Sequence, residues 1–367
     1  MSTNLIGARF QYARELAGLT QAEASRKMGF KDRQTLSAIE AGIRMVSAEE
    51  LVKAVEVLDQ SIDFFTDPLR LVNEGAFTWH VSSSQSEKML SALAETAGSY
   101  LALYRVLTES AGRRVASLEP RLVLEGSGTV EQAVSRARSL SEDWDLGTVP
   151  ADRLETVVTS KLPFQVLTVR LAKGVLSGAC RLAGFSTVFL SEDLSYEARS
   201  VELARQCFHL LTWEALTPPG CVVEMNAPKG KSTVAHTERM ARQFVGEILL
   251  PKKRLEELWQ VRSREGLKFF ITEVERFFSV PAEFVVERLI TLDVLPEREV
   301  NKLKNLRFSR ESNGRRALFN KDFIRAVHQG LLRGLISERK LFGLLGLKRE
   351  ELIGLFMADG LKFQVMD

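Results

Sequence analysis

The sequence predicts an α+β protein that is mostly helical, with a helical bundle at the N-terminus, a small antiparallel sheet in the middle and a helical C-terminal extension. Three observations carry this prediction. Residues 1–65 contain several short amphipathic segments with helix-capping residues. Three β-rich runs separated by glycine-containing turns lie between residues 163 and 190. Helical periodicity then returns in residues 323–361.

The first 65 residues are expected to form four or five short helices. Two capping boxes pair a Ser or Thr with a Glu three residues later: Thr20 with Glu23, and Ser47 with Glu50. Gly29 closes the second helix and introduces a tight turn before the third. Short helices in this arrangement describe a helix-turn-helix domain.

Four short motifs in this bundle resemble the repressor-type (XRE, Cro/CI-like) DNA-binding domain: Leu19-Thr-Gln-Ala-Glu23, Met28-Gly-Phe30, Gln34-Thr-Leu-Ser37 and Ile39-Glu-Ala-Gly42. The resemblance implies that the third helix enters the major groove. It implies phosphate contacts for Gln21 and Arg44, and it assigns Glu40 to the inside of the domain. Base contacts are implied for Arg33, Gln34 and Ser37 of the third helix. Thr35, on the same helix, is also expected to bind DNA.

The overall composition is that of a globular protein and does not by itself indicate a nucleic-acid partner. The chain of 367 residues has a formal net charge of only +3. Its three cysteines form no CxxC pair, which is typical of reduced thiols. No signal layout is visible, and no apolar run approaches the roughly 20 residues that span a bilayer. We therefore expect a cytoplasmic protein without a membrane partner.

Residues 67–128 are expected to form a linker and one long helix. The segment Phe77–His80 is predicted to be extended, and His80 is interpreted as structural or solvated because it has no partner at metal-ligand spacing. The long helix after residue 86 either forms a dimer seam or packs on the next domain. A repressor-type reader gains affinity by pairing two copies, so a homodimer is expected.

The central region, residues 129–308, is predicted to combine helices with three strands. The strand-like runs begin at Pro163, Val175 and Ser186. Two helices are expected around 197–213 and 238–250, with a loop over 221–231 between them. Helices are again expected in the C-terminal extension, residues 309–367.

This central region resembles the ImmA/IrrE family of zinc-peptidase domains. Four motifs carry the resemblance: Trp144-Asp-Leu-Gly147, Ser177-Gly-Ala-Cys180, Ala204-Arg-Gln-Cys-Phe-His-Leu-Leu211 and the segment from Glu238 to Pro251. A His-Glu-x-x-His helix supplies two zinc ligands one turn apart, with the intervening Glu as general base. The resemblance therefore implies a metallopeptidase fold.

The ligand and base positions depart from the family pattern. His209 and Glu238 occupy retained ligand positions, but Arg205 and Gln206 replace the first His and the base. An arginine stays protonated and repels a metal, and a neutral amide cannot accept the proton. We expect no catalytic residue, no metal and no cofactor, with a bidentate Arg205–Glu238 ion pair where the metal would be. A zinc site rebuilt from His209, Glu238 and His236 is the alternative.

The function expected from these features is DNA-binding transcriptional regulation. Double-stranded operator DNA is the expected partner, and the peptidase-like cavity is expected to take a small-molecule or peptide effector. Two alternatives remain: a zinc peptidase that cleaves a repressor, and an interaction module such as an antitoxin or phage-defence component. The basic run from Lys302 to Lys321 is interpreted as a solvated loop or as an arm that contacts phosphate.

Overall fold

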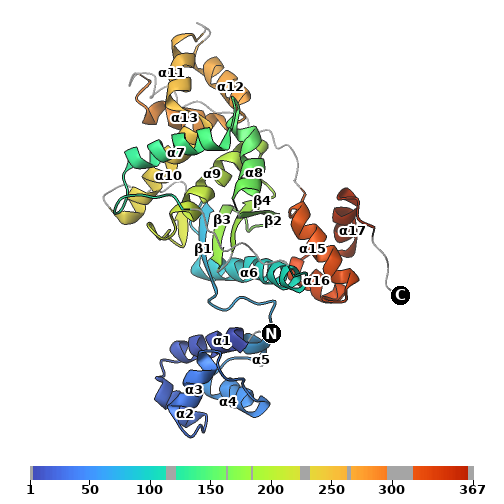
Figure 1. Ribbon diagram of the computed structural model, residues 1–367. Coiled ribbons are helices and arrows are strands. Elements are labelled where there is room, and N and C mark those ends of the chain that lie inside the picture. The colour runs from blue at the N-terminus through green and yellow to red at the C-terminus, as the bar shows by residue number, and fades with distance from the viewer. Residues whose placement is uncertain are drawn as a thin grey trace. The chain divides into compact units, whose positions relative to one another are not determined.

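The computed structural model (Figure 1) describes residues 3–112, 121–162, 164–182, 185–223, 232–262, 266–295 and 317–362. The predicted fold class is confirmed, because helices dominate and a small sheet accompanies them. Most of the basic run from Lys302 to Lys321 lies outside the described residues. No helix of the described part is long and apolar enough to cross a membrane.

The chain divides into two compact units that interleave along the sequence. The first comprises Met1–Ala76, Ser91–Arg114 and Ala326–Arg349, and the second comprises Phe77–Leu90, Val115–Arg325 and Glu350–Asp367. Each unit therefore draws on several of the consecutive segments expected from the sequence. The boundaries at residues 66, 128 and 308 stay a prediction.

The N-terminal bundle of the first unit has five helices: α1 (Thr3–Leu16), α2 (Gln21–Lys27), α3 (Arg33–Glu40), α4 (Ala48–Leu58) and α5 (Ile62–Thr66). Both predicted capping boxes are present at the starts of α2 and α4. The buried side chains of Phe10, Met28, Leu36, Ile39 and Phe65 form its core. The periodicity and the caps therefore locate these helices correctly.

Glycine is required where α1 crosses α3. A Cβ atom at Gly7 would lie 2.2 Å from the carbonyl oxygen of Ile39. The two helix backbones approach so closely that no side chain fits between them. This contact fixes α3 against α1 and determines which face of α3 points outward.

Helix α6 (Glu87–Ser110) is packed within its own chain. Residues 100–103 are buried consecutively, so the helix is enclosed on all sides there. A Cβ atom at Gly330, in α15 (Lys321–Leu332), would lie 2.4 Å from Cδ2 of Leu107. The first unit also contains α16 (Glu338–Leu345). Helix α6 thus packs on the C-terminal extension within the first unit. The two alternatives for it, a dimer seam and packing on the next domain, stay predictions.

The sheet has five strands in the order β2-β4-β3-β1-β5. The strands are β1 (Gly75–Val81), β2 (Phe164–Val169), β3 (Val175–Leu182), β4 (Phe185–Ser191) and β5 (Cys221–Val223). Strand β3 pairs antiparallel with β4, whereas β2 with β4 and β1 with β5 are parallel. The sheet is therefore mixed rather than antiparallel. Residues 221–223, expected in a loop, instead form the edge strand.

The second unit also contains helices, some of them beside the sheet and others farther from it (Figure 1). They are α7 (Val130–Trp144), α8 (Pro150–Lys161), α9 (Tyr196–Thr212), α10 (Thr233–Leu249), α11 (Lys252–Gln260), α12 (Leu267–Phe278), α13 (Ala282–Thr291) and α17 (Arg349–Ala358). Helix α9 is buried along most of its length and packs on α8, α10, β3 and β4. Its polar residues at positions 202–209 are consequently held inside the unit.

Candidate nucleic-acid interface and buried polar cluster

Helix α3 presents a polar face to solvent because its apolar residues point inward. Leu36 and Ile39 are buried, whereas Arg33 and Gln34 are exposed. Asp32 caps the helix: its Oδ1 accepts a hydrogen bond from the backbone N–H of Thr35 at 3.0 Å. A capped helix with an outward polar face has the form needed for insertion into a major groove.

The four residues of α3 that are predicted to bind DNA differ in exposure. Thr35 and Ser37 are half-buried, and the Thr35 hydroxyl donates to Asp32 Oδ1 at 3.3 Å. Thr35 therefore supports the helix cap as well as lying on the helix surface. Arg33 and Gln34 make no side-chain hydrogen bond or ion pair within the part of the chain that is described. At the start of α3, Arg33 and Gln34 are therefore the two side chains that no hydrogen bond within the described residues holds in place.

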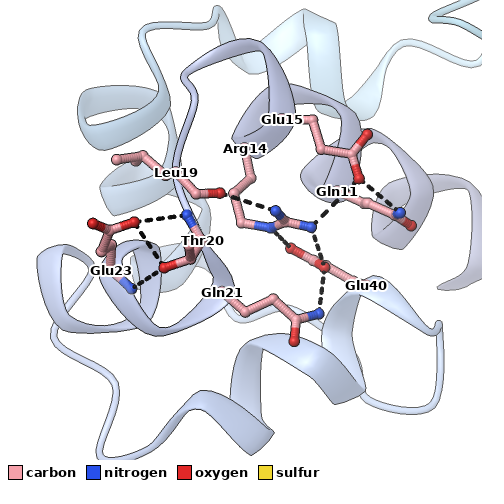
Figure 2. Close-up of polar contacts among 8 residues, drawn as sticks. All are labelled: Gln11, Arg14, Glu15, Leu19, Thr20, Gln21, Glu23 and Glu40. Carbon is pink, nitrogen blue, oxygen red and sulfur yellow. Dashed lines mark hydrogen bonds and ion pairs between the residues drawn. The ribbon is translucent and has the colours of Figure 1, made fainter.

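Glu40 is the centre of a polar group that ties three helices together (Figure 2). The Arg14 guanidinium donates to both carboxylate oxygens of Glu40, at 2.6 and 3.1 Å, and to the carbonyl of Leu19 at 2.9 Å. Gln21 Nε2 donates to Glu40 Oε2 at 2.8 Å. The hydrogen bond to Glu40 is the main cause of a raised pKa for Arg14. The interpretation of Glu40 as an internal partner is confirmed.

The side chain of Gln21, which is predicted to contact a phosphate, is already oriented by its hydrogen bond to Glu40. One amide hydrogen of Gln21 is used by Glu40, which leaves a second hydrogen on the same nitrogen. Gln21 is half-buried at the start of α2, where backbone N–H groups without intrahelical partners favour an anion. Glu40 thus limits the directions in which the Gln21 amide can donate.

Arg44 lies in the loop between α3 and α4 and is paired with Glu50. Its Nη2 and Nη1 donate to Oε1 and Oε2 of Glu50 at 2.8 and 3.0 Å. These bonds are the first cause of a raised pKa for Arg44 and of a lowered pKa for Glu50. The residue predicted to meet a phosphate therefore already has an anionic partner.

The four positions of the degenerate metal site are brought together inside the second unit. Arg205, Gln206 and His209 lie on α9, and Glu238 lies on α10; all four are buried. Arg205 Nη1 donates to Glu238 Oε2 at 3.1 Å. His209 Nε2 lies 3.3 Å from the other carboxylate oxygen, Oε1. The expected Arg205–Glu238 contact is confirmed, but it is not bidentate, because the second oxygen faces His209.

His236 does not join this group. Its Nε2 lies 2.9 Å from the carbonyl oxygen of Gly128. No three His, Cys, Asp or Glu side chains of the described residues are placed to hold a metal ion. A protonated guanidinium stands beside the carboxylate that would ligate the metal. The donor set therefore does not fit the zinc ion that the resembled family implies.

Three buried residues that sequence reasoning did not assign to the site extend this cluster. The imidazole Nδ1 of His80, on β1, lies 2.8 Å from Oε2 of Glu202. Ser177, on β3, donates to the same oxygen at 2.5 Å and accepts from Gln206 Nε2 at 2.7 Å. Glu202 lies one helical turn before Gln206, a spacing that marks a shared face. His80 is 122 residues distant from Glu202, and no local pattern connects them.

Both buried carboxylates of the cluster are ionised at neutral pH. Burial raises the pKa of Glu202, but the charge and hydrogen bond of His80, the charge of Arg205 and the bond from Ser177 together lower it to about 2. Burial likewise raises the pKa of Glu238, and His209, Arg205 and His80 lower it to about 2. Glu202, Glu238 and Arg205 thus lie together in one buried polar cluster.

A pocket of about 490 Å³ lies elsewhere in the second unit. It is lined by the face of α8 around Glu155, the first half of α9 around Arg199, and the start of α15 at Lys321. None of the four degenerate metal-site residues lines it. Arg199 is held there by Glu155 through two hydrogen bonds of 2.8 Å. The expected effector cavity beside the former metal positions gains no support from this pocket.

Comparison with known proteins defines the class of the N-terminal domain. Residues 10–65 match the family model HTH_3, helix-turn-helix. This part of the chain is an XRE-type helix-turn-helix domain.

A solved structure is also similar to the chain, namely the apo form of the competence regulator ComR from Streptococcus vestibularis. The sequences are 9% identical, the comparison covers 99% of this chain and 100% of that chain, and the TM-score is 0.17. A TM-score this low carries no argument about fold or function. No curated protein matches the chain.

Proposed function

We propose that the protein is a DNA-binding transcriptional regulator that reads its operator with α3. The match of residues 10–65 to a helix-turn-helix family is the observation that carries this proposal. The exposed polar start of α3 supports it, because the side chains that would reach base edges lie there. Arg33 suits guanine and Gln34 suits adenine through paired hydrogen bonds. Gln21 would contact the DNA backbone, whereas Arg44 is paired with Glu50 and could do so only if that pair opened.

The proposal assigns a non-catalytic role to the second unit, as a sensor or an interaction domain. The donor set around Glu238 supports this assignment, because an arginine takes the place of one ligand and a glutamine the place of the base. A regulator also needs a unit that responds to a signal. The resemblance to a peptidase fold makes a small molecule or a peptide the proposed effector class.

Operator selection from random duplexes, followed by footprinting, tests the DNA-binding function. We expect the combined substitution Gln34→Ala and Ser37→Ala to abolish selectivity, because each change removes a hydrogen-bonding group from the α3 surface. Removing one such base-reading side chain should weaken operator binding by about 1–3 kcal/mol. Binding to unrelated duplex DNA should change little, since phosphate contacts carry no sequence information.

Gln11→Ala is the matched control, because Gln11 is exposed on α1 and its side chain bonds only Glu15 within the described part of the chain. It should leave the footprint unchanged. An unchanged footprint in the Gln34 and Ser37 double variant would show that α3 is not the reading helix. Absence of any salt-dependent DNA binding would instead favour an interaction module.

A further inference from the structure

The Arg44–Glu50 pair is placed where the proposed DNA complex needs a free cation. Arg44 lies in the loop that follows the C-cap of α3, and its backbone N–H donates to the carbonyl of Ala38 at 3.1 Å. The loop is therefore anchored to the helix that carries the base-contacting residues. The Arg44 side chain is 43% exposed, whereas that of Glu50 is 16% exposed. The guanidinium faces solvent on one side and the carboxylate on the other.

Glu50 has two separable roles in the structure. Its Oε2 accepts from the backbone N–H of Ser47 at 2.9 Å, and its own N–H donates to Ser47 Oγ at 3.2 Å. This capping box needs an acceptor oxygen at position 50, which a glutamine also supplies. The negative charge is needed only for the pair with Arg44. Charge and cap can therefore be separated by a single substitution.

A carboxylate and a phosphate compete for the same donor geometry. Arg44 presents two N–H groups to the two oxygens of Glu50, and the same fork fits two oxygens of a phosphate. The carboxylate is already in place, six residues away on a capped helix start, so holding Arg44 requires little further ordering. Removing Glu50 would leave the guanidinium with water as its alternative partner.

We propose that Glu50 withholds Arg44 from the DNA backbone, so that the wild-type domain binds with one phosphate contact fewer than its fold permits. This inference rests on the proposed DNA-binding function. It identifies Glu50 as the residue that sets the strength and salt dependence of binding, while α3 sets the sequence. Weaker backbone binding raises the share of sequence-specific contacts in the total affinity.

The inference is tested by measuring the affinity of the full chain for a random-sequence duplex at several salt concentrations, with fluorescence anisotropy as the readout. Glu50→Gln should make the slope of log affinity against log salt steeper by about 0.9, the value for one additional phosphate contact. The ratio of the Glu50→Gln affinity to the wild-type affinity should consequently be roughly three-fold larger at about 50 mM than at about 200 mM salt. Arg44→Ala in the Glu50→Gln background should abolish this advantage.

Two controls separate the pair from general charge effects. Glu49→Gln removes the same charge one residue away, and Glu49 is exposed with no side-chain partner among the described residues. Any increase in affinity from Glu49→Gln should be independent of Arg44. Arg44→Ala in the otherwise wild-type chain should leave the salt slope unchanged. This last variant tests the inference even if Glu50→Gln fails to fold.

The outcomes distinguish this inference from the function on which it rests. Equal slopes for Glu50→Gln and wild type would overturn the inference. A shallower slope for the single variant Arg44→Ala than for wild type would also overturn it. In either case salt-dependent binding by the wild-type chain would leave the proposed function standing. If neither wild type nor any variant bound duplex DNA, both the function and the inference would be rejected.

Discussion

At the scale of single residues, buried or half-buried charges organise both candidate sites. Glu40 holds Arg14 and Gln21 in the N-terminal bundle. Glu238 holds Arg205 and lies beside His209 in the second unit. Each glutamate joins side chains from different helices, so its charge affects the relative placement of those helices. Removing a partner from such a pair leaves a charge without compensation.

Glu40→Gln should destabilise the N-terminal bundle by about 1–3 kcal/mol. The substitution removes the charge that satisfies the Arg14 guanidinium, whose side chain is only 11% exposed. Urea-dependent hydrogen exchange of the amides in α1–α3 would measure the loss of stability locally. Glu15→Gln is the matched control, since Glu15 contacts the same arginine at 3.6 Å from an exposed position. Equal protection in both variants would contradict the role of Glu40.

Glu238→Gln should destabilise the second unit by about 3 kcal/mol, because Arg205 would lose the buried carboxylate to which it donates. Thermal unfolding of the full chain would measure this change. Glu256→Gln is the control, because it removes only an exposed pair with Lys252 at 3.7 Å. A melting temperature unchanged by Glu238→Gln would contradict the role of the Arg205–Glu238 pair.

At the scale of elements, helix positions follow from the sequence more closely than strand pairing does. The two capping boxes and the apolar spacing locate α2, α3 and α4 because these signals act within a few residues. The β-rich runs likewise locate β2, β3 and β4. The pairing of β1 with β5 was not predicted, because strands of 7 and 3 residues carry no local signal for partners so distant along the chain. Long-range pairing is decided by the packed sheet.

The contact between β1 and β3 makes a specific demand on Gly178. A Cβ atom at this position would lie 2.2 Å from Cε3 of Trp79, whose ring is buried. Gly178→Ala should therefore lower the stability of the second unit by about 1–3 kcal/mol, because the buried ring has to move. Thermal unfolding and the yield of folded protein would report the change.

Gly220→Ala is the corresponding control next to β5. Nothing lies within 4 Å of a Cβ atom at Gly220, so the added methyl group meets no neighbour. This variant should unfold within about 0.5 kcal/mol of wild type, as is usual for surface changes. If Gly178→Ala were equally well tolerated, the close approach of Trp79 to β3 would not hold in solution.

At the scale of the whole molecule, two interleaved units share one chain. The helix-turn-helix bundle belongs to the first unit together with most of α6 and of α15. Within that unit Glu74 accepts from Arg9 of α1 at 3.2 Å and from Arg105 of α6 at 2.5 Å. The helix-turn-helix bundle is thereby connected to a helix far along the chain. A division of the chain into consecutive domains does not describe this arrangement, because the contacts join segments that are distant in sequence.

Elemental analysis of the protein, purified without chelators or affinity nickel, would test the proposed absence of a resident metal. We expect less than about one tenth of an equivalent of zinc, because a structural or catalytic zinc site needs three or four converging protein ligands. Close to one equivalent, removed by His209→Ala or Glu238→Gln, would show that the site is rebuilt. Peptidase activity would then have to be measured before operator binding.

The sequence alone determined the fold class and the capped helices of the N-terminal bundle. Those features depend on neighbours within one or two helical turns, and periodicity records them directly. It also indicated that Arg205 would meet Glu238, because both positions could be carried over from a resembled motif.

Only the tertiary structure decided which charges compensate one another. His80, Ser177 and Glu202 converge because β1, β3 and α9 pack together. The second oxygen of Glu238 faces His209 rather than Arg205 for the same reason. In the N-terminal bundle, Glu50 closes on Arg44 across the loop. A buried or paired charge takes its partner from whatever the fold places within a few ångströms, and sequence separation carries no information about that distance.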